Sequence, residues 1–297
     1  MDRPKRVYVS VPRDHNLDER QRRLKHAILA ELHANGIEPQ EFQVSGLALR
    51  APYTFGAVKE IMGRCHGVLV LAFARWTDPS GNGHLALPTV WNHFEGAFAL
   101  ALGKELLVIT EENVAGDGIT WSGGGQIVLW APTDAGPDWL RSDDPRRQFE
   151  AWMQVITRTD DIFLAYSSKA RATANDILKF LGSRGVAVCD WELDFAAGAT
   201  ILDEIGEASR RCLGAIMLLT RDDNLMGEEN FAAPRDNVIF EMGMFMEAKG
   251  RERVLVIREE GAKMPADIGG GIYLPLKNRD DITPIHMRLL DFIEKRI

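Results

Sequence analysis

The sequence predicts an α/β protein built from two tandem domains, each a doubly wound parallel sheet of about five strands. Two observations predict this fold. Short apolar runs rich in Val, Ile and Leu alternate with segments of helical periodicity, and the order of these features in the first half of the chain recurs in the second. Continuous apolar runs are typical of parallel strands that are covered on both faces.

The repeat is visible as markers that keep a nearly constant offset of 146 to 148 positions. Cys65 in the segment RCHG corresponds to Cys212 in RCLG, and Glu95 corresponds to Glu241. The segment LLVITEE at 106–112 corresponds to VLVIREE at 254–260, and the glycine triplet at 123–125 corresponds to that at 269–271. Each half has a typical domain length, so we interpret the chain as two copies of one fold.

The elements of the first half follow from this alternation. Short apolar runs predict strands at 6–11, 38–43, 67–72, 105–110 and 127–130. Apolar residues at helical spacing predict helices at 18–35, 55–65 and 89–102.

The second half repeats the pattern and adds a terminal helix. Strands are predicted at 162–167, 187–191, 214–220, 253–258 and 272–276. Helices are predicted at 173–184, 201–211, 237–249 and 284–296.

Turn-forming residues at 132–138 separate the two copies. We therefore expect an amino-terminal domain at 1–131, a linker at 132–158 and a carboxyl-terminal domain at 159–297. The linker contains an amphipathic stretch with Phe149, Trp152, Met153 and Ile156 at helical spacing. This spacing predicts a linker helix that packs between the domains.

Composition excludes several classes of function. The chain has 35 basic and 43 acidic side chains, and neither half carries the basic excess that nucleic-acid binding needs. The three cysteines form no disulfide framework or zinc pattern, and the seven histidines show no ligand spacing, so we expect no metal site. With no room for a signal peptide and no apolar run long enough to span a membrane, a cytoplasmic location is expected.

Polar residues just after strands are the first candidates for a site, because ligands of open parallel sheets bind at the carboxyl ends of the strands. In the second half these include Tyr166 and Ser167 after the first strand and Trp191 at the end of the second. The glycine triplets lack the residues of a phosphate-binding loop, so flexible turns are the simpler interpretation.

Glu241 is a different kind of candidate, since its helix is apolar nearly all round. A carboxylate there is costly unless it is paired or faces a cleft. Asn237 lies one turn earlier on the same face, and Arg235 stands just ahead of the helix. A buried salt bridge with Arg235 and a functional carboxylate are both open interpretations. Glu95, with Asn92 three residues earlier, poses the same question in the first half.

From about Asp160 to the end, the chain resembles the bacterial Toll/interleukin receptor (TIR) domains, especially the predicted nucleotide-binding, TIR-like branch. The resemblance is carried by the segments DIFLAYSSK at 161–169, DW at 190–191, GATIL at 198–202, PRDNVIFEMG at 234–243 and GRERV at 250–254. The first half resembles, more loosely, the nucleotide-sensing Rossmannoid domains that accompany bacterial immune effectors.

The resemblance implies that Glu241 is the catalytic carboxylate of an NAD glycohydrolase, which releases nicotinamide and forms a linear or cyclic product. NAD would be the substrate, and no cofactor is implied. By the same resemblance, Tyr166, Ser167 and Trp191 line the substrate pocket. Arg235 and Asn237 orient Glu241 or the phosphates.

We therefore expect an antiphage effector whose first domain senses a nucleotide second messenger or mediates self-association, with Glu95 and Asn92 as a second or regulatory site. The main alternative is a non-catalytic nucleotide-binding or assembly module, which would bind a nucleotide without turnover. A base-exchange transferase acting on nucleosides is a further hypothesis that rests on fold analogy alone.

Overall fold

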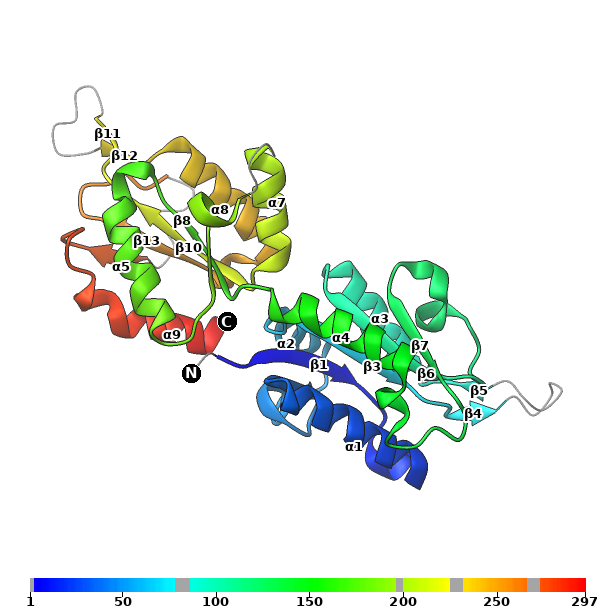
Figure 1. The fold of residues 1–297 in the computed structure, drawn as a ribbon. Helices are drawn as coiled ribbons and strands as arrows, with labels where there is room; N and C mark the ends of the chain where they lie inside the picture. Colours follow the sequence, from blue (N-terminus) through cyan, green and yellow to red (C-terminus); the bar gives the residue numbers. More distant parts are fainter. Residues whose placement is uncertain (1–2, 78–85, 196–199, 225–231, 266–272) are drawn as a thin grey trace. The chain divides into compact units, whose positions relative to one another are not determined.

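The computed structural model describes residues 3–77, 86–195, 200–224, 232–265 and 273–297. They form an amino-terminal unit, Pro4–Arg158, and a carboxyl-terminal unit, Thr159–Ile297, to which Arg3 also belongs. Each unit contains one five-stranded parallel sheet with helices on both faces, which confirms the predicted fold class (Figure 1). The glycine triplet at 269–271 and the first residue of the strand expected at 272–276 lie outside the described residues.

The sheet of the amino-terminal unit has the strand order β2-β1-β3-β6-β7. Its strands are β1 (Lys5–Ser10), β2 (Ile37–Glu41), β3 (Gly67–Ala72), β6 (Glu105–Glu111) and β7 (Ile127–Ala131), all paired in parallel. This is the order 2-1-3-4-5 of flavodoxin-like sheets, in which the chain reverses direction across the sheet beside the first strand.

Among the described residues, four α-helices cover this sheet: α1 (Glu19–Ala34), α2 (Phe55–Gly63), α3 (Val90–Ala101) and α4 (Asp143–Thr157). Alternate residues of the strands face opposite sides, as strand geometry requires. Val7 and Val9 join a core with α1 and α4, whereas Tyr8 joins a second core with α2 and α3. Thr89 caps α3 by accepting a hydrogen bond from the Asn92 N–H, while the Asn92 side chain accepts one from the Thr89 N–H.

The carboxyl-terminal unit repeats the same topology. Its strand order is β9-β8-β10-β13-β14, again 2-1-3-4-5 and again all parallel. The strands are β8 (Ile162–Ala165), β9 (Val188–Asp190), β10 (Gly214–Leu219), β13 (Val254–Glu259) and β14 (Leu274–Leu276).

The helices of this unit are α5 (Arg171–Gly182), α6 (Trp191–Asp194), α7 (Ile201–Arg211), α8 (Asp236–Lys249) and α9 (His286–Arg296). Helices α5 and α9 cover one face together with Ile162, Leu164 and Tyr166. Helices α7 and α8 cover the other face together with Phe163 and Ala165.

Helix α4 packs on one face of the first sheet in the way that α9 packs on one face of the second. The expected linker helix is thus part of the core of the amino-terminal unit, with Phe149, Trp152, Met153 and Ile156 all buried in it. A Cβ on Gly67 would lie 2.2 Å from the Ile156 Cδ1 atom, and a Cβ on Gly214 would lie 2.5 Å from the Ile297 Cδ1 atom. Equivalent glycines therefore let the last helical segment of each unit approach the sheet closely.

A short antiparallel pair that the sequence did not predict follows the third strand of each sheet. In the amino-terminal unit it consists of β4 (Trp76–Thr77) and β5 (Ala86–Leu87), and in the other unit of β11 (Asp223–Asn224) and β12 (Ala232–Ala233). Each pair leads into the helix that carries the glutamate of interest, α3 or α8.

Because α4 is packed this closely on its sheet, Gly67→Ala should destabilise the amino-terminal unit by about 1–3 kcal/mol through overpacking. Ile156→Val removes the Cδ1 atom that the new methyl group would meet, so the double variant should be less destabilised than the sum of the two single variants, by about 1 kcal/mol. Chemical denaturation of the four proteins measures this coupling. Strictly additive effects would show that α4 does not pack on Gly67.

Candidate functional site

Glu241 lies on the buried face of α8, and its side chain is 5% exposed. Burial raises the pKa of this carboxyl group to about 7, although a hydrogen bond from the Asn237 side chain opposes the shift. The Oε2 atom is buried and has no hydrogen-bond partner among the described residues. Glu241 is therefore a carboxyl group that changes its charge near neutral pH and keeps unused hydrogen-bonding capacity.

Arg235 does not neutralise Glu241 in the described part of the chain. Its guanidinium Nη1 lies 3.2 Å from the Asp223 Oδ2 atom, and its backbone N–H donates to the Asp222 carboxylate. The salt bridge with Glu241 that the sequence left open is thus not formed, and Arg235 instead ties the start of α8 to the segment after β10. The sequence had placed Asn237 beside Glu241, and the structure brings these two residues together.

Polar side chains from two strands meet at the carboxyl edge of the sheet. The Ser167 Oγ atom lies 3.5 Å from the Thr220 Oγ1 atom, and the Thr220 hydroxyl donates to Asp222. These residues follow β8 and β10, the neighbouring strands at which the chain reverses direction. This is the edge where ligands bind in sheets of this type.

Tyr166 is fully buried and belongs to the core that α5 and α9 cover. Its hydroxyl donates to the Asp190 Oδ1 atom over 2.6 Å, and its ring centroid lies 5.9 Å from that of Trp191. Burial raises the pKa of Tyr166 to about 12. The structure brings Tyr166 and Trp191 together, but it packs Tyr166 and Glu241 into the cores on opposite faces of the sheet.

Asp190 and Thr220 are polar residues of this edge that sequence reasoning missed, because both stand at the end of apolar runs that were interpreted as strand. The signal that finds them is a single polar side chain at the last position of an otherwise apolar strand. Asp190 accepts the Tyr166 hydroxyl, and its Oδ2 atom has no partner among the described residues.

The equivalent carboxylate of the amino-terminal unit has a different environment. Glu95, 5% exposed on α3, accepts hydrogen bonds on Oε1 from the hydroxyls of Tyr8 and Tyr53, each over 2.7 Å. Ser10 also bonds to this carboxylate, and Asn92 donates to the Ser10 hydroxyl over 3.1 Å. Burial raises the pKa of Glu95, while the three hydroxyl groups oppose that shift.

Strand register explains why the two carboxylates differ. Gly67 begins β3, which pairs with β1, and Gly214 begins β10, which pairs with β8. When the two sheets are aligned on these glycines, Tyr8 corresponds to Phe163 and Ser10 corresponds to Ala165. Two of the three hydroxyl groups that form hydrogen bonds with Glu95 are thus replaced by apolar side chains in the other unit. Glu241 therefore receives less compensation for its burial.

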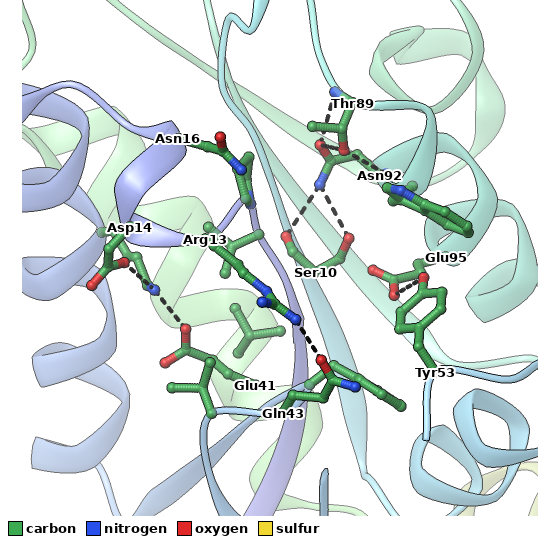
Figure 2. A pocket seen from close by; sticks show the side chains of 17 residues that line it. Ser10, Arg13, Asp14, Asn16, Glu41, Gln43, Tyr53, Thr89, Asn92 and Glu95 are labelled. Atoms are coloured by element: carbon green, nitrogen blue, oxygen red, sulfur yellow. Dashed lines mark hydrogen bonds and ion pairs between the residues drawn. The ribbon is translucent and has the colours of Figure 1, made fainter. Parts of the chain in front are cut away.

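Glu95 and Asn92 line a cavity of about 620 Å³, which opens at the carboxyl ends of β1 and β2. Figure 2 shows Glu95, Ser10 and Asn92 grouped beside Tyr53, with Arg13 hydrogen-bonded to Gln43 elsewhere in the lining. The structure therefore brings together the two residues that the sequence singled out in the first half. Tyr8, Tyr53 and Ser10, which sequence reasoning missed, complete their surroundings.

A group of possible metal ligands, Asp160, Cys189 and Cys212, is present among the described residues, with ligand atoms within 4.8 Å of one another. Arg211 lies against this group. Its Nε atom is 3.0 Å from Asp160 Oδ2, and its Nη2 atom donates to the Cys189 sulfur over 3.1 Å. A guanidinium at this position repels a cation, so the group does not support a metal site.

Within the described ranges, no helix is both long and apolar enough to cross a membrane.

Because burial raises the pKa of Glu241 from 4.5 to about 7, the folded chain holds a proton that the unfolded chain releases. The contribution of Glu241 to the free energy of unfolding should therefore fall by about 3 kcal/mol as the pH rises from 4.5 to 7. Glutamine does not titrate, so Glu241→Gln should abolish this decrease in the free energy of unfolding. The variant should therefore be more stable than the wild type at pH 8 and not at pH 4.5.

Denaturant titrations of both proteins at the two pH values measure this difference. Glu247→Gln, an exposed position on the same helix, is the matched control for the replacement of a glutamate by glutamine. A Glu241→Gln variant with the wild-type pH dependence would contradict the assigned protonation.

Residues 161–278 match the family described as "CAP12/Pycsar effector protein, TIR domain". The CD-NTase-associated protein 12 of Sphingobacterium faecium is 34% identical over 110 residues, which are 37% of this chain and 34% of that protein. The Pycsar effector protein BcPycTIR of Burkholderia cepacia is 32% identical over 119 residues, 38% of this chain and 39% of that protein.

The CD-NTase-associated protein 12 of Flavobacterium daejeonense is 46% identical over 89 residues, 28% of this chain and 29% of that protein. The chain thus spans between 29% and 39% of the length of these relatives. The resemblance of the second half to bacterial TIR domains is confirmed, because residues 161–278 match the TIR domain of CAP12/Pycsar effector proteins.

Proposed function

We propose that the carboxyl-terminal unit hydrolyses the N-glycosidic bond between nicotinamide and ribose in NAD, and that the chain acts as an antiphage effector. The observation that carries the proposal is the state of Glu241, a buried helix carboxyl group whose pKa is raised to about 7 and whose Oε2 atom has no partner among the described residues. The match to relatives named as Pycsar effectors supports the biological role.

The reaction needs one carboxylate. The C1′–N bond breaks with its electron pair leaving on nicotinamide, which departs as a neutral molecule and requires no general acid, unlike the leaving group of ordinary glycoside hydrolysis. The ribose that remains carries oxocarbenium character. A carboxylate beside the ribose hydroxyls stabilises this positive charge more in the transition state than in the ground state. Water then adds to C1′ and releases a proton, giving ADP-ribose.

In this proposal Glu241 acts in its ionised form, and Asn237 orients it. Ser167 at the sheet edge and the ring of Trp191 contact the substrate. Tyr166 is a positioning residue, since its hydroxyl holds Asp190 directly ahead of Trp191. Arg235 fixes the first turn of α8 through Asp223 and Asp222, and thereby the position of Glu241.

We propose further that the amino-terminal unit gates this activity, either by sensing a nucleotide second messenger or by self-association. NAD is the substrate in this scheme and not a resident cofactor. The proposal of different roles for the two units rests on the different surroundings of their carboxyl groups. Glu95 accepts hydrogen bonds from three hydroxyl groups, whereas two of the equivalent positions beside Glu241 are apolar.

Glu241→Gln should lower nicotinamide release from NAD by at least about a hundredfold, because the amide cannot stabilise a developing cation. Release is measured with concentrated full-length protein, with and without a panel of cyclic oligonucleotides and NAD-derived signals. Glu247→Gln, an exposed position on the same helix, is the control that should retain NAD cleavage in activated protein. Unchanged release by Glu241→Gln would refute the mechanism, and nucleotide binding without release under any condition would favour the non-catalytic module.

The pH dependence of the activated wild type should follow the ionisation of Glu241. Since only the carboxylate is active, the rate should rise about tenfold per pH unit below 7, pass half-maximum near pH 7 and level off above pH 8. Initial rates of nicotinamide release between pH 5 and 9 measure this profile. A rate that is already maximal at pH 5 would show that the essential group is not a carboxyl with a raised pKa.

A further inference from the structure

The cavity of the amino-terminal unit has the position and size of a ligand site. It measures about 620 Å³, within the usual range for small-molecule pockets. Its walls come from the segments after β1 and β2 and from the first turns of α3. The carboxyl ends of the first strand and its neighbours are where doubly wound sheets bind ligands, so this cavity stands at the expected place for one.

One wall of the cavity is a set of hydrogen-bonding groups around the buried carboxyl group of Glu95. Tyr8 and Tyr53 both donate to the Oε1 atom of Glu95, so the remaining capacity of this carboxylate lies mainly on its other oxygen. Figure 2 shows that oxygen directed toward Ser10 and the interior of the cavity. Asn92 holds Ser10 in place through its side-chain amide. This wall is suited to a ligand with hydroxyl groups, which both donate and accept hydrogen bonds.

A second wall is aromatic. Phe42, Tyr53 and Trp91 follow one another edge to face, with centroid separations of 4.8 Å for both pairs. Trp91 is 53% exposed and Tyr53 is 38% exposed, although both line the cavity. Exposed aromatic rings that line a cavity provide a surface on which a flat heterocycle can stack.

The charges of the lining limit how many phosphate groups the ligand can carry. Lys25 is buried and already paired with Asp14 and Glu41, through distances of 2.8 and 2.6 Å. The guanidinium of Arg13 donates to Gln43 and forms no ion pair with any residue that the structure describes. The lining has two cations, Lys25 and Arg13, and three carboxyl groups, two of which already pair with Lys25. Arg13 is thus the one cation of the lining that is available to a phosphate, and a second phosphate would meet carboxyl groups without a cation to pair with.

We propose that this cavity binds a ribonucleoside carrying at most one phosphate, with the base stacked on Trp91, the ribose hydroxyls at Glu95 and Ser10, and a phosphate, where present, at Arg13. The three features of the lining account for the three parts of such a ligand. A dinucleotide such as NAD, with two phosphates, fits the charge of this cavity poorly. The inference concerns binding by the amino-terminal unit and holds whether or not the other unit cleaves NAD.

The test is isothermal titration calorimetry on full-length protein carrying Glu241→Gln, so that turnover in the other unit does not consume the probe. The probes are the four common ribonucleosides, their 5′-monophosphates, the 2′,3′-dideoxy forms of the same nucleosides, and NAD. At least one ribonucleoside and its monophosphate should bind, and the dideoxy form should bind about tenfold more weakly.

Three exposed side chains provide the variants, so loss of the fold does not complicate the comparison. Trp91→Ala should weaken binding of the nucleoside and the monophosphate about tenfold or more. Arg13→Ala should weaken only the monophosphate, to the affinity of the nucleoside. Leu100→Ala, exposed on the same helix and outside the cavity lining, should change neither.

The proposal is overturned if no ribonucleoside or monophosphate binds at millimolar concentration, or if the binding observed is insensitive to Trp91→Ala. It is also overturned if NAD binds more tightly than every monophosphate in a manner that Trp91→Ala abolishes. Equal affinity for ribose and dideoxyribose forms would remove the role assigned to Glu95. None of these results bears on nicotinamide release by the other unit, which is tested separately through Glu241.

Discussion

Burial of a carboxyl group on the helix that follows the third strand is the constraint on which both units depend. A carboxyl group buried between a parallel sheet and its covering helix has little access to water, so its charge must be compensated by nearby donors or avoided by keeping the proton. In the amino-terminal unit Tyr8, Tyr53 and Ser10 supply donors to Glu95. In the carboxyl-terminal unit Asn237 bonds to Glu241, and the proton is retained up to about pH 7.

This difference separates the roles of two units that share one topology. A carboxylate that side-chain hydroxyl groups hold in place is a fixed part of a binding wall, as Glu95 is in its cavity. A carboxyl group with an unused buried oxygen can form its best interaction with a positive charge that develops during a reaction, and this is the property proposed for Glu241. The exchange of Tyr8 and Ser10 for Phe163 and Ala165 therefore connects the sequence of one strand to the chemistry of the neighbouring helix.

Much of the fold was predictable because it rests on periodicity. The repeated apolar runs located both sheets, and the constant offset identified the duplication. Side-chain contacts between distant elements were not predictable in this way. Nothing in the local sequence shows that Tyr8 and Tyr53 reach Glu95, and the amphipathic pattern of α4 shows that one face is buried without showing which sheet buries it. The close approach of Ile156 to Gly67 settles that question.

The candidate site was predictable only in part, namely where it depends on periodicity within one helix or one strand. Spacing along one helix placed Asn237 beside Glu241, and strand ends drew attention to Ser167 and Trp191. Tyr166 shows the limit of the method, because alternation along β8 sends its side chain to the core opposite that of Glu241. Alternation along the predicted strand at 162–167 places Tyr166 on the face of Ile162 and Leu164, but the sequence does not show that α8 covers the other face.

The most direct test of the central claim is an NMR pH titration of the carboxyl carbons in protein labelled at glutamate, with Glu241→Gln used to assign the signal. The structure predicts that one resonance, absent from the variant, titrates with a pKa of about 7. A Glu241 signal that titrates near 4.5, the ordinary value for glutamate, would contradict both the environment described for this carboxyl group and the mechanism built on it.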